Sequence, residues 1–416
     1  MIKFEKNNEN CCVVAQLKNV RKHPNADRLQ IATVLGESII VGLEAKEDDK
    51  VLYFDSNLCL SNEYCEKNNL FSRSSLNSDP TKKGYFGDKG RVRPTTLRGE
   101  KSYGFVAQID SLNYVAENIN ENDFPLGQEF NSVNGVEICK KYIVMSTKNS
   151  NPSHKRKEKK DRKVSSKMFP EHWDTKKFLK EIDNVPPNQM IYLELKEHGT
   201  SGRIANVLAD KKIGFLKRIL NKLGADFNTQ FQIVMNGTRR VNLTRSDSSL
   251  QFYKGDIRDV VFNKLKDHVK QNEQLYFEIC GYDTNGSWIQ KGFPYGCEPG
   301  QHRITLYRVS INTPDGGVYD LSREYVYRRA EELGINAPYL FEKFFYDGDK
   351  ETLIKKVESF TDGKDPIDPS HIREGVVLWF MDKKGKWTCL KNKSFDFLEL
   401  EDKQKDSGTI DIEDHL

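Results

Sequence analysis

A short alternating segment that runs directly into a glycine-rich turn, residues 191–203, constrains the fold of this chain most strongly. From position 191 to Lys196 the side chains alternate between aliphatic and polar, which predicts a β-strand with one buried face. Residues 198–202, His-Gly-Thr-Ser-Gly, predict a turn directly after this strand, because glycine permits positive φ and hydroxyls bond nearby backbone groups. A lysine held there can be partly dehydrated, which suits a nucleophile that must lose its proton to react. An ordinary surface lysine on an edge strand fits the same pattern.

Size and composition are those of a protein with two or three domains, because the chain has 416 residues, 37% of them hydrophobic and 30% charged. No apolar run is as long as a membrane span, and the first residues do not resemble a signal peptide. We therefore expect an intracellular protein, cytoplasmic or nuclear, with no membrane partner. The net charge is only +4, so any nucleic-acid surface must be local. The eight cysteines form no Cys-x-x-Cys pair, which predicts reduced thiols and no zinc site.

The first part of the chain, residues 1–145, is predicted to be a small β-barrel built from short strands such as 13–17, 30–34, 38–41 and 51–54. Residues 23–29, His-Pro-Asn-Ala-Asp-Arg-Leu, resemble a loop of OB-fold modules that bind tRNA. Residues 90–105 resemble the second half of the OB domain that precedes the catalytic domain in one RNA ligase family. Nucleic-acid binding is favoured for this region as a whole: the basic side chains that could follow phosphates are Lys89, Arg91, Arg93, Arg98 and Lys101, and the aromatic ones that could stack on bases are Tyr85, Phe86 or Tyr103. Each of these residues taken alone is better explained as a solvated or core side chain.

Residues 146–167 are polar and strongly basic with almost nothing apolar, which predicts a linker. The linker is expected to be solvated, and contact with RNA phosphates or nuclear import are alternatives. A second domain is predicted from residue 168 to residue 400. The last residues, 401–416, are predicted to be an acidic tail.

Five short motifs occur in the second domain, and each places a polar residue on the alternate face of a predicted strand. They are Lys196-Glu197-His198-Gly199, Glu278 within Leu-Tyr-Phe-Glu-Ile-Cys-Gly, Tyr307 within Ile-Thr-Leu-Tyr-Arg-Val, Glu374-Gly375-Val376-Val377, and Lys391-Asn392-Lys393. Their order and spacing resemble those of the covalent nucleotidyltransferases, the polynucleotide ligases and capping enzymes. Each motif alone occurs by chance in many proteins, whereas the whole set in this order is specific. Phe277 departs from the pattern, because glycine is frequent at that position.

The resemblance implies a site for ATP with Mg²⁺ or Mn²⁺. It implies catalytic roles for Lys196, which takes AMP, and for Lys391 and Lys393, whose charge favours the uncharged amine of Lys196 and holds the α-phosphate. Metal binding is implied for Glu278 and Glu374, and for His198, which stands where other ligases have an aspartate. The nucleotide-binding set that the resemblance implies is Glu194, Leu195, Lys196, Glu197, Gly199, Arg239, Arg240, Glu278, Tyr307, Lys391 and Lys393. If their segment is extended, Arg239 and Arg240 point to opposite faces, so only one of them can face the site.

Domain order is similar to that of the fifth RNA ligase family, since the OB-like region lies in front and too few residues follow Lys393 to form another barrel. The predicted fold is α+β: an N-terminal OB-fold β-barrel, joined by a basic linker to a mixed α/β nucleotidyltransferase (ATP-grasp-like ligase) domain built on antiparallel sheets. The predicted function is that of an ATP-dependent RNA ligase, a monomer that joins a 3′-OH end to a 5′-phosphate end in RNA or an RNA-containing duplex. A GTP-dependent capping guanylyltransferase and a non-catalytic RNA-binding protein are the alternatives.

Overall fold

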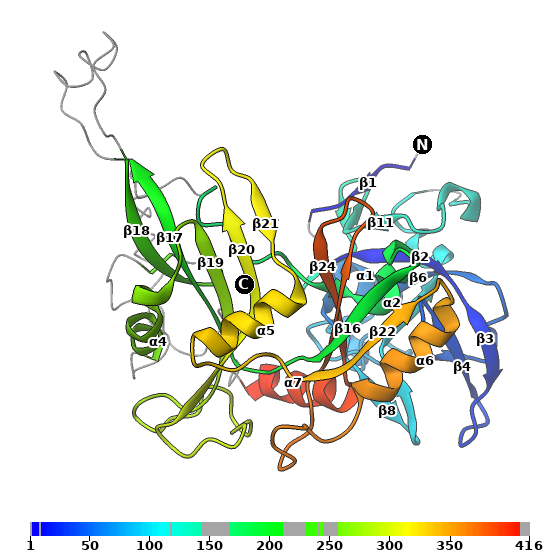
Figure 1. Ribbon diagram of the computed structural model, residues 1–416. Helices are drawn as coiled ribbons and strands as arrows, with labels where there is room; N and C mark the ends of the chain where they lie inside the picture. Colours follow the sequence, from blue (N-terminus) through cyan, green and yellow to red (C-terminus); the bar gives the residue numbers. More distant parts are fainter. Residues whose placement is uncertain are drawn as a thin grey trace, which may run out of the picture. The chain divides into compact units, whose positions relative to one another are not determined.

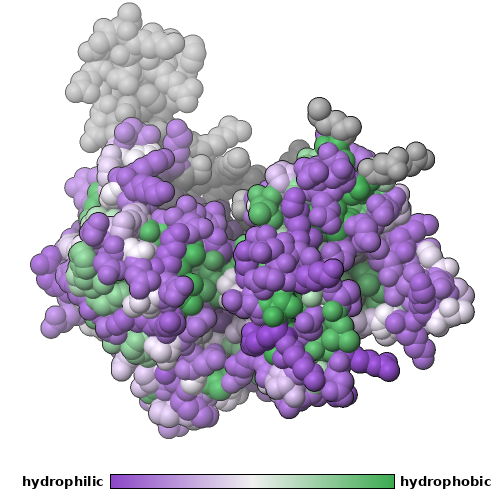
Figure 2. Space-filling model, turned by 90° about the vertical axis from the view of Figure 1, so that its right-hand side faces the viewer, coloured by the Kyte–Doolittle hydropathy of each residue, from purple (hydrophilic) through white to green (hydrophobic). Residues whose placement is uncertain are grey.

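The computed structural model describes residues 2–7, 10–116, 119–142, 167–210, 230–239, 242–243 and 257–407. The chain divides into two compact units, Met1–Met145 with Leu398–Gly408, and Ser146–Phe397 with Thr409–Leu416. Apart from Lys167, the predicted linker lies outside the described residues, as does Arg240. None of the described helices is long and apolar enough to cross a lipid bilayer. On the face drawn in Figure 2, hydrophilic side chains cover most of the described surface.

The first unit consists mainly of short antiparallel strands, as the alternating pattern predicts. Its sheets have the orders β1-β12-β13, β10-β6-β2-β11, β14-β7, β3-β4-β5 and β8-β9. In the described residues these sheets do not close into one barrel, so the OB fold stays a prediction. The elements are β1 (Phe4–Glu5), β2 (Cys12–Gln16), β3 (Lys18–Lys22), β4 (Leu29–Val34), β5 (Glu37–Gly42), β6 (Lys50–Asp55), β7 (Leu58–Leu60), α1 (Asn62–Lys67), β8 (Thr95–Leu97), β9 (Glu100–Ser102), β10 (Gly104–Gln108), β11 (Glu129–Phe130), β12 (Ser132–Val133), β13 (Val136–Glu137) and β14 (Cys139–Lys141).

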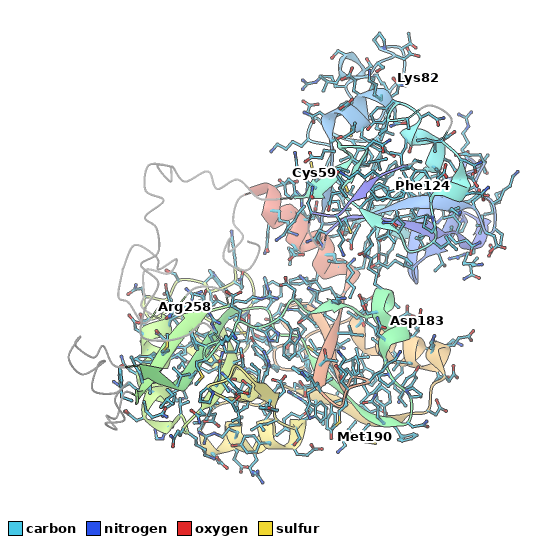
Figure 3. The ribbon with its side chains drawn as sticks, turned by 90° about the horizontal axis from the view of Figure 1, so that it is seen from above. Cys59, Lys82, Phe124, Asp183, Met190 and Arg258 are labelled. Atoms are coloured by element: carbon cyan, nitrogen blue, oxygen red, sulfur yellow. The ribbon has the colours of Figure 1, made fainter. Side chains whose placement is uncertain are left out.

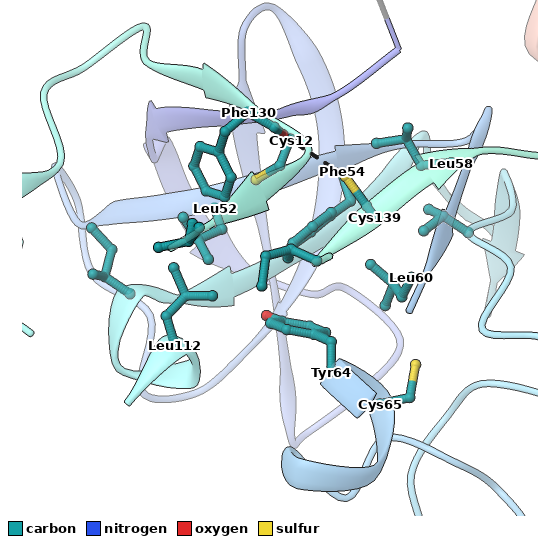
Figure 4. Packing of buried hydrophobic residues seen from close by; sticks show 14 of the residues in the cluster. Cys12, Leu52, Phe54, Leu58, Leu60, Tyr64, Cys65, Leu112, Phe130 and Cys139 are labelled. Carbon is teal, nitrogen blue, oxygen red and sulfur yellow. Dashed lines mark hydrogen bonds between the residues drawn. The ribbon is translucent and has the colours of Figure 1, made fainter. Parts of the chain in front are cut away.

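The largest core cluster of this unit packs aromatic rings among aliphatic and cysteine side chains (Figure 4). Phe54 of β6 and Tyr64 of α1 lie with ring centroids 5.6 Å apart. Phe86 belongs to this core as well, with 2% of its surface exposed, so it is not available to stack on a base, whereas Tyr85 next to it is 61% exposed. Of the neighbouring pair predicted to stack, only Tyr85 is therefore accessible.

Two of the arginines predicted to follow phosphates are instead paired within the protein. Arg91 donates to Asp406 at 2.6 Å and also to Asp402, and Arg93 contacts the same two carboxylates. Both acids lie on α7 (Phe395–Ser407), four residues apart and therefore on one face of the helix. Residues 401–407, predicted to belong to an acidic tail, are thus helical, and their charge explains why Arg91 can be buried.

We expect Arg91→Ala to lower the free energy of unfolding of this unit by about 3 kcal/mol, because it leaves Asp402 buried with part of its countercharge removed. Urea unfolding of the full chain followed by circular dichroism measures the loss. Arg93→Ala removes the same charge from the same carboxylates, but its side chain is 45% exposed, so a cost below about 1 kcal/mol is expected. Equal effects of the two changes would contradict a buried ion pair.

The second unit contains two five-stranded sheets with the orders β15-β24-β23-β16-β22 and β18-β17-β19-β20-β21. All pairings are antiparallel except that of β15 with β24, which agrees with the predicted α+β class. Helix α5 packs on β20, and α6 packs on β23 and β24 (Figure 1). The elements are β15 (Lys176–Lys177), α2 (Phe178–Glu181), β16 (Gln189–Leu195), β17 (Thr200–Asp210), β18 (Gln230–Thr238), α4 (Ile257–Leu265), β19 (Glu273–Gly281), β20 (His302–Asn312), β21 (Val318–Asp320), α5 (Arg323–Glu332), β22 (Leu340–Tyr346), α6 (Lys350–Thr361), β23 (Gly375–Met381) and β24 (Trp387–Lys393).

The strand that precedes Lys196 is buried on both faces, which corrects the prediction of one buried face. Ile191 and Leu193 of β16 lie in one apolar core. Tyr192 lies on the other face, where it packs with Trp379 and Cys389. Within the sheet β22 and β23 flank β16 on either side, so neither of its edges is free. The strand is interior because side chains pack against both of its faces. A polar side chain on that second face must therefore be paired inside the protein.

Candidate active site

Lys196 lies where the chain leaves the first sheet of the second unit and enters the second sheet. It follows the last residue of β16, and its backbone N–H donates to the carbonyl of Gly375 at 3.0 Å. Three residues later the turn passes so close to β19 that a Cβ at Gly199 would lie 2.2 Å from the carbonyl oxygen of Ile279. Only glycine fits there. The Lys-x-x-Gly spacing thus reflects a close crossing of two strands, and this crossing fixes the position of Lys196.

Glu374, at the start of β23, is the carboxylate around which the cations gather. Its Oε1 lies 2.9 Å from Nζ of Lys196 and 3.2 Å from Nζ of Lys393, and its Oε2 lies 3.8 Å from Nδ1 of His198. Only 2% of its side chain is exposed. Burial by itself would raise the pKa of Glu374, but the charges of Lys196 and Lys393 outweigh burial and lower it to about 2. The carboxylate is therefore ionised at all ordinary pH values.

The packing of β23 against β24 requires glycine at position 375, directly after Glu374. Gly375 has φ +148°, and a Cβ there would lie 2.1 Å from the carbonyl oxygen of Asn392 on β24. The backbones of β23 and β24 therefore meet closely between Glu374 and Lys393, which are joined by an ion pair. This contact explains why the Glu-Gly and Lys-x-Lys motifs occur together.

Lys391 lies in a cationic environment. Burial lowers the pKa of Lys391 to about 7, and the charges of Lys393, Lys196 and Arg239 add to the effect. Arg239 therefore lies near this cluster, and its Nη2 donates to Asp174 at 2.9 Å, whereas Arg240 lies outside the described residues. Several cations in one place, with one buried carboxylate, make a site suited to a polyanion such as a triphosphate.

We expect Lys391→Met to stabilise the folded protein at neutral pH. The folded protein has a Lys391 pKa of about 7 against an ordinary 10.5, so the unfolded chain binds this proton more tightly. The loss of folding free energy that protonated Lys391 causes is therefore complete below pH 7 and disappears as the pH rises towards 10.5. Thermal unfolding should show an advantage of about 1–2 kcal/mol for the variant at pH 6.5, shrinking by pH 9.5. If the variant is less stable than wild type at pH 6.5, the charge of Lys391 does not destabilise the folded protein.

Glu278, Ser201 and Tyr307 form a polar group on the second sheet. Oε1 of Glu278 accepts a hydrogen bond from the backbone of Gly199 at 3.1 Å, and Oε2 accepts one from Ser201 Oγ at 3.1 Å. The same Oγ lies 3.2 Å from the hydroxyl of Tyr307. Burial, followed by the charge of Glu278, raises the pKa of Tyr307. Glu278 therefore ties the turn after Lys196 to β19, and Tyr307 lies beside it.

Phe277 does not obstruct this group. Its side chain is 3% exposed and belongs to the apolar core on the opposite face of β19. Gly202 lies across from it in register, where a Cβ would be 2.4 Å from the phenylalanine ring. The space that glycine leaves in β17 is therefore filled by Phe277 of this chain.

The side chains of Glu194 and Glu197 are engaged away from the cation cluster. Glu194 is bound by Arg323, whose Nε donates to Oε1 at 2.8 Å. Glu197 accepts a hydrogen bond from Thr305 Oγ1 at 2.7 Å, and Arg303 Nε lies 3.5 Å away. Burial raises the pKa of both carboxyls. These contacts give the two side chains a structural function, and Leu195 between them is a buried apolar residue.

His198 is held firmly by aromatic neighbours. Its backbone N–H donates to the hydroxyl of Tyr295 at 2.6 Å, and its ring lies edge-on to Phe293 at 4.9 Å and to Phe397 at 4.8 Å. The turn continues into Thr200, whose hydroxyl accepts a hydrogen bond from Arg258 of α4 at 2.7 Å. Figure 3 labels Arg258 among the side chains of the second unit. The whole loop after Lys196 is thus fixed from several sides.

The carboxylates fit a divalent cation that is shared with a nucleotide, rather than one enclosed by protein. Within the described ranges no group of three or more His, Cys, Asp or Glu side chains is placed to hold a metal ion. Oε2 of Glu374 is nevertheless buried without a hydrogen bond, and Glu278 offers a second carboxylate. Mg²⁺ commonly uses one or two carboxylates together with phosphate oxygens and water. These residues therefore fit such an ion only when phosphates complete its shell.

Residues 168–175, which we call the strap, contact the site and were not identified from the sequence. Asp174 of the strap binds Arg239, and Thr175 lies 3.9 Å from Sγ of Cys389 on β24. The strap then becomes β15, where Lys177 is paired in register with Lys391. No local pattern marks these residues, because Arg239, Cys389 and Lys391, to which the strap is joined, are distant in sequence.

Solved structures of one enzyme resemble this chain over nearly its whole length. A lysine-to-alanine mutant of the Naegleria gruberi RNA ligase with ATP and Mn matches with a TM-score of 0.57 and 13% identity, covering 96% of this chain and 99% of that one. A lysine-to-methionine mutant with AMP and Mn gives 0.59 and 14%, with coverages of 94% and 99%. The same ligase with PPi gives 0.58 and 12%, with coverages of 95% and 100%. This chain shares the fold of that RNA ligase.

At these identities the likeness establishes the fold and leaves the activity to be argued from the site. No family model matches the sequence, and the search of curated proteins gave no match.

Proposed function

We propose that this protein is an ATP-dependent RNA ligase that works through a lysyl-AMP intermediate on Lys196. The observation that carries the proposal is the cluster of Lys196, Lys393 and Lys391 around the buried Glu374, with Lys196 and Lys393 at 2.9 and 3.2 Å from its carboxylate. The shared fold with an RNA ligase solved with ATP, AMP and PPi supports it. The motif order along the chain agrees with this assignment.

In the first step the uncharged Nζ of Lys196 bonds to the α-phosphorus of ATP, the bond from that phosphorus to pyrophosphate breaks, and the proton that the amine loses passes to solvent. Lys391, Lys393 and Arg239 neutralise negative charge on the phosphates as it moves towards the leaving group. Glu374 orients Lys196 before attack, since its low pKa makes it a poor proton acceptor but a stable countercharge. A bound Mg²⁺ or Mn²⁺, held by Glu278 or Glu374 together with phosphate oxygens, would add further neutralisation.

Two further transfers complete the proposed reaction. AMP passes from Lys196 to the 5′-phosphate of an RNA end, and a 3′-hydroxyl then attacks that phosphate and releases AMP. We assign RNA contact to the first unit, as an OB domain of the fifth RNA ligase family, with the exposed Tyr85 as a candidate for stacking on a base. Arg91 and Arg93 are left out of this assignment because α7 pairs with both.

Sealing of a nicked duplex with a 3′-OH RNA end and a labelled 5′-phosphate end tests the proposal. We expect joined product with ATP plus Mg²⁺ or Mn²⁺, and none with GTP. Transfer of GMP instead of AMP to the protein would favour the capping guanylyltransferase. RNA binding without reaction with either nucleotide would favour the non-catalytic RNA-binding protein.

A further inference from the structure

His172 of the strap lies among groups that serve the proposed nucleotide site. Its ring centroid is 5.2 Å from that of Tyr307, edge-on, and 4.8 Å from that of Trp173. Its Nδ1 lies 3.2 Å from Nη1 of Arg308, which is stacked on the ring of Trp173 at 3.6 Å. His172 is half-buried, so its position is defined by packing while part of its surface remains accessible.

The contact with Arg308 determines where the imidazole carries its proton. Arginine only donates hydrogen bonds, so Nδ1 of His172 must be the acceptor. The ring is then neutral, with its hydrogen on Nε2. In the described part of the chain no protein group takes a hydrogen bond from this Nε2, and the atom is not among those that are buried and unpartnered. A fixed N–H donor is thus presented to solvent or to a ligand.

The charged groups that act on His172 are cations, of which Arg308 is paired with Asp320 and Arg239 with Asp174. Burial lowers the pKa of His172 well below its ordinary value, and the charges of Arg308, Arg239, Lys196 and Lys391 act in the same direction. Two of these, Lys196 and Lys391, belong to the cluster around Glu374. A neutral N–H group next to these cations can donate a hydrogen bond to a polyanion. In the protein without ligand it adds no further positive charge, so it does not increase the repulsion among the cations.

We propose that His172 is a nucleotide-binding residue, which donates its Nε2 hydrogen to a phosphate oxygen of bound ATP. This inference rests on the proposed function, and it assigns a role to a histidine that lies outside all the motifs. The strap that carries His172 is anchored to the second sheet by carbonyl groups: Met168 accepts from Asn312 at 3.2 Å, and Pro170 accepts from Gln274 at 2.8 Å. The donor is therefore positioned before the nucleotide arrives.

Two substitutions separate hydrogen bonding from packing. His172→Phe keeps a ring against Tyr307 and Trp173 but removes the donor and the acceptor. His172→Gln removes the ring but can accept from Arg308 with its carbonyl and donate with its amide. His302→Phe is the matched control, since His302 is a half-buried histidine on β20 outside the cation cluster.

The measurement is the ATP concentration dependence of lysine adenylation, compared with sealing of an RNA strand that already carries AMP on its 5′-phosphate. We expect His172→Phe to raise KM for ATP about tenfold or more, because the lost hydrogen bond is to a charged group. His172→Gln should regain most of that loss, and sealing of the pre-adenylated strand should be nearly unchanged in both, since that step uses no ATP. His302→Phe should leave KM for ATP unchanged.

Three results would overturn the assignment. His172→Phe could match wild type in KM for ATP, or His172→Gln could be the more impaired of the two, which would indicate packing alone. Equal loss of adenylation and of sealing would indicate a general structural role. If wild type itself takes no AMP from ATP, the proposed function is rejected, and the role of His172 is rejected with it. Normal adenylation of wild type with unaffected variants would reject only the role of His172.

Discussion

Lys196→Ala is expected to abolish transfer of AMP to the protein, with a loss of at least about 1,000-fold, because no other group replaces the attacking amine. Lys391 and Lys393 are also lysines of the cluster, but they lie on β24, whereas Lys196 lies on the turn between the two sheets. Labelling with ATP that carries radioactive phosphorus in the α position, followed by a denaturing gel, measures the transfer.

Two controls show whether the lost group is the nucleophile or only part of the fold. Lys196→Arg keeps a cation next to Glu374 but cannot attack phosphorus at neutral pH, so it should be equally inactive in labelling. Both variants should still bind RNA, and both should seal a strand that already carries AMP at its 5′ end. Labelling of either variant at a rate near that of wild type would refute the assignment of Lys196.

Glu374→Ala is expected to have the second largest effect, because it removes the countercharge of Lys196 and Lys393 from a buried position. Breaking a buried ion pair by removing one partner costs about 3–5 kcal/mol of folding free energy. Adenylation should fall as well, since the amine of Lys196 loses its orienting partner. Glu374→Gln keeps the shape and removes the charge, so it should share most of the loss. Chemical denaturation and the labelling assay measure the two effects separately.

The pH dependence of stability provides an independent check on Glu374. Its pKa is lowered from 4.5 to about 2 in the folded protein, so the stabilisation it contributes is complete above about pH 4.5 and is lost as the pH falls towards 2. Wild type should therefore lose stability over this range more steeply than Glu374→Gln. Glu342→Ala serves as control: it breaks the partly exposed pair between Glu342 on β22 and Lys356 on α6 and should lower the free energy of unfolding by less than about 1 kcal/mol. Parallel pH profiles for wild type and Glu374→Gln would contradict the buried ion cluster.

The sequence predicted the strands that carry the site because their alternation is local. The polar residue of each motif lies at a strand or directly beside one, as with Glu278 on β19, Tyr307 on β20 and Glu374 before β23. The structure then shows why two glycines of the motifs occur where they do, through backbone contacts at Gly199 and Gly375. The periodicity of the sequence cannot predict these contacts, because they join segments that are far apart in the chain.

Predictions from the sequence were weakest where a polar residue is paired far along the chain. Glu194 was expected at the nucleotide, yet its carboxylate is bound by Arg323, 129 residues away. Arg91 was one of several basic residues that could follow a phosphate, and the structure pairs it with Asp402, 311 residues away. A basic or acidic side chain in a motif looks the same whether its partner is a ligand or the protein, and only the folded chain distinguishes the two cases.

The most direct test of Lys196 as the nucleophile is to incubate the purified full chain with ATP and Mg²⁺ and map the adduct by mass spectrometry of its peptides. We expect a single acid-labile AMP group, attached to Nζ of Lys196, with pyrophosphate released in equal amount. An AMP group on Lys391 or Lys393, or no adduct with ATP under conditions in which the protein remains folded, would contradict it.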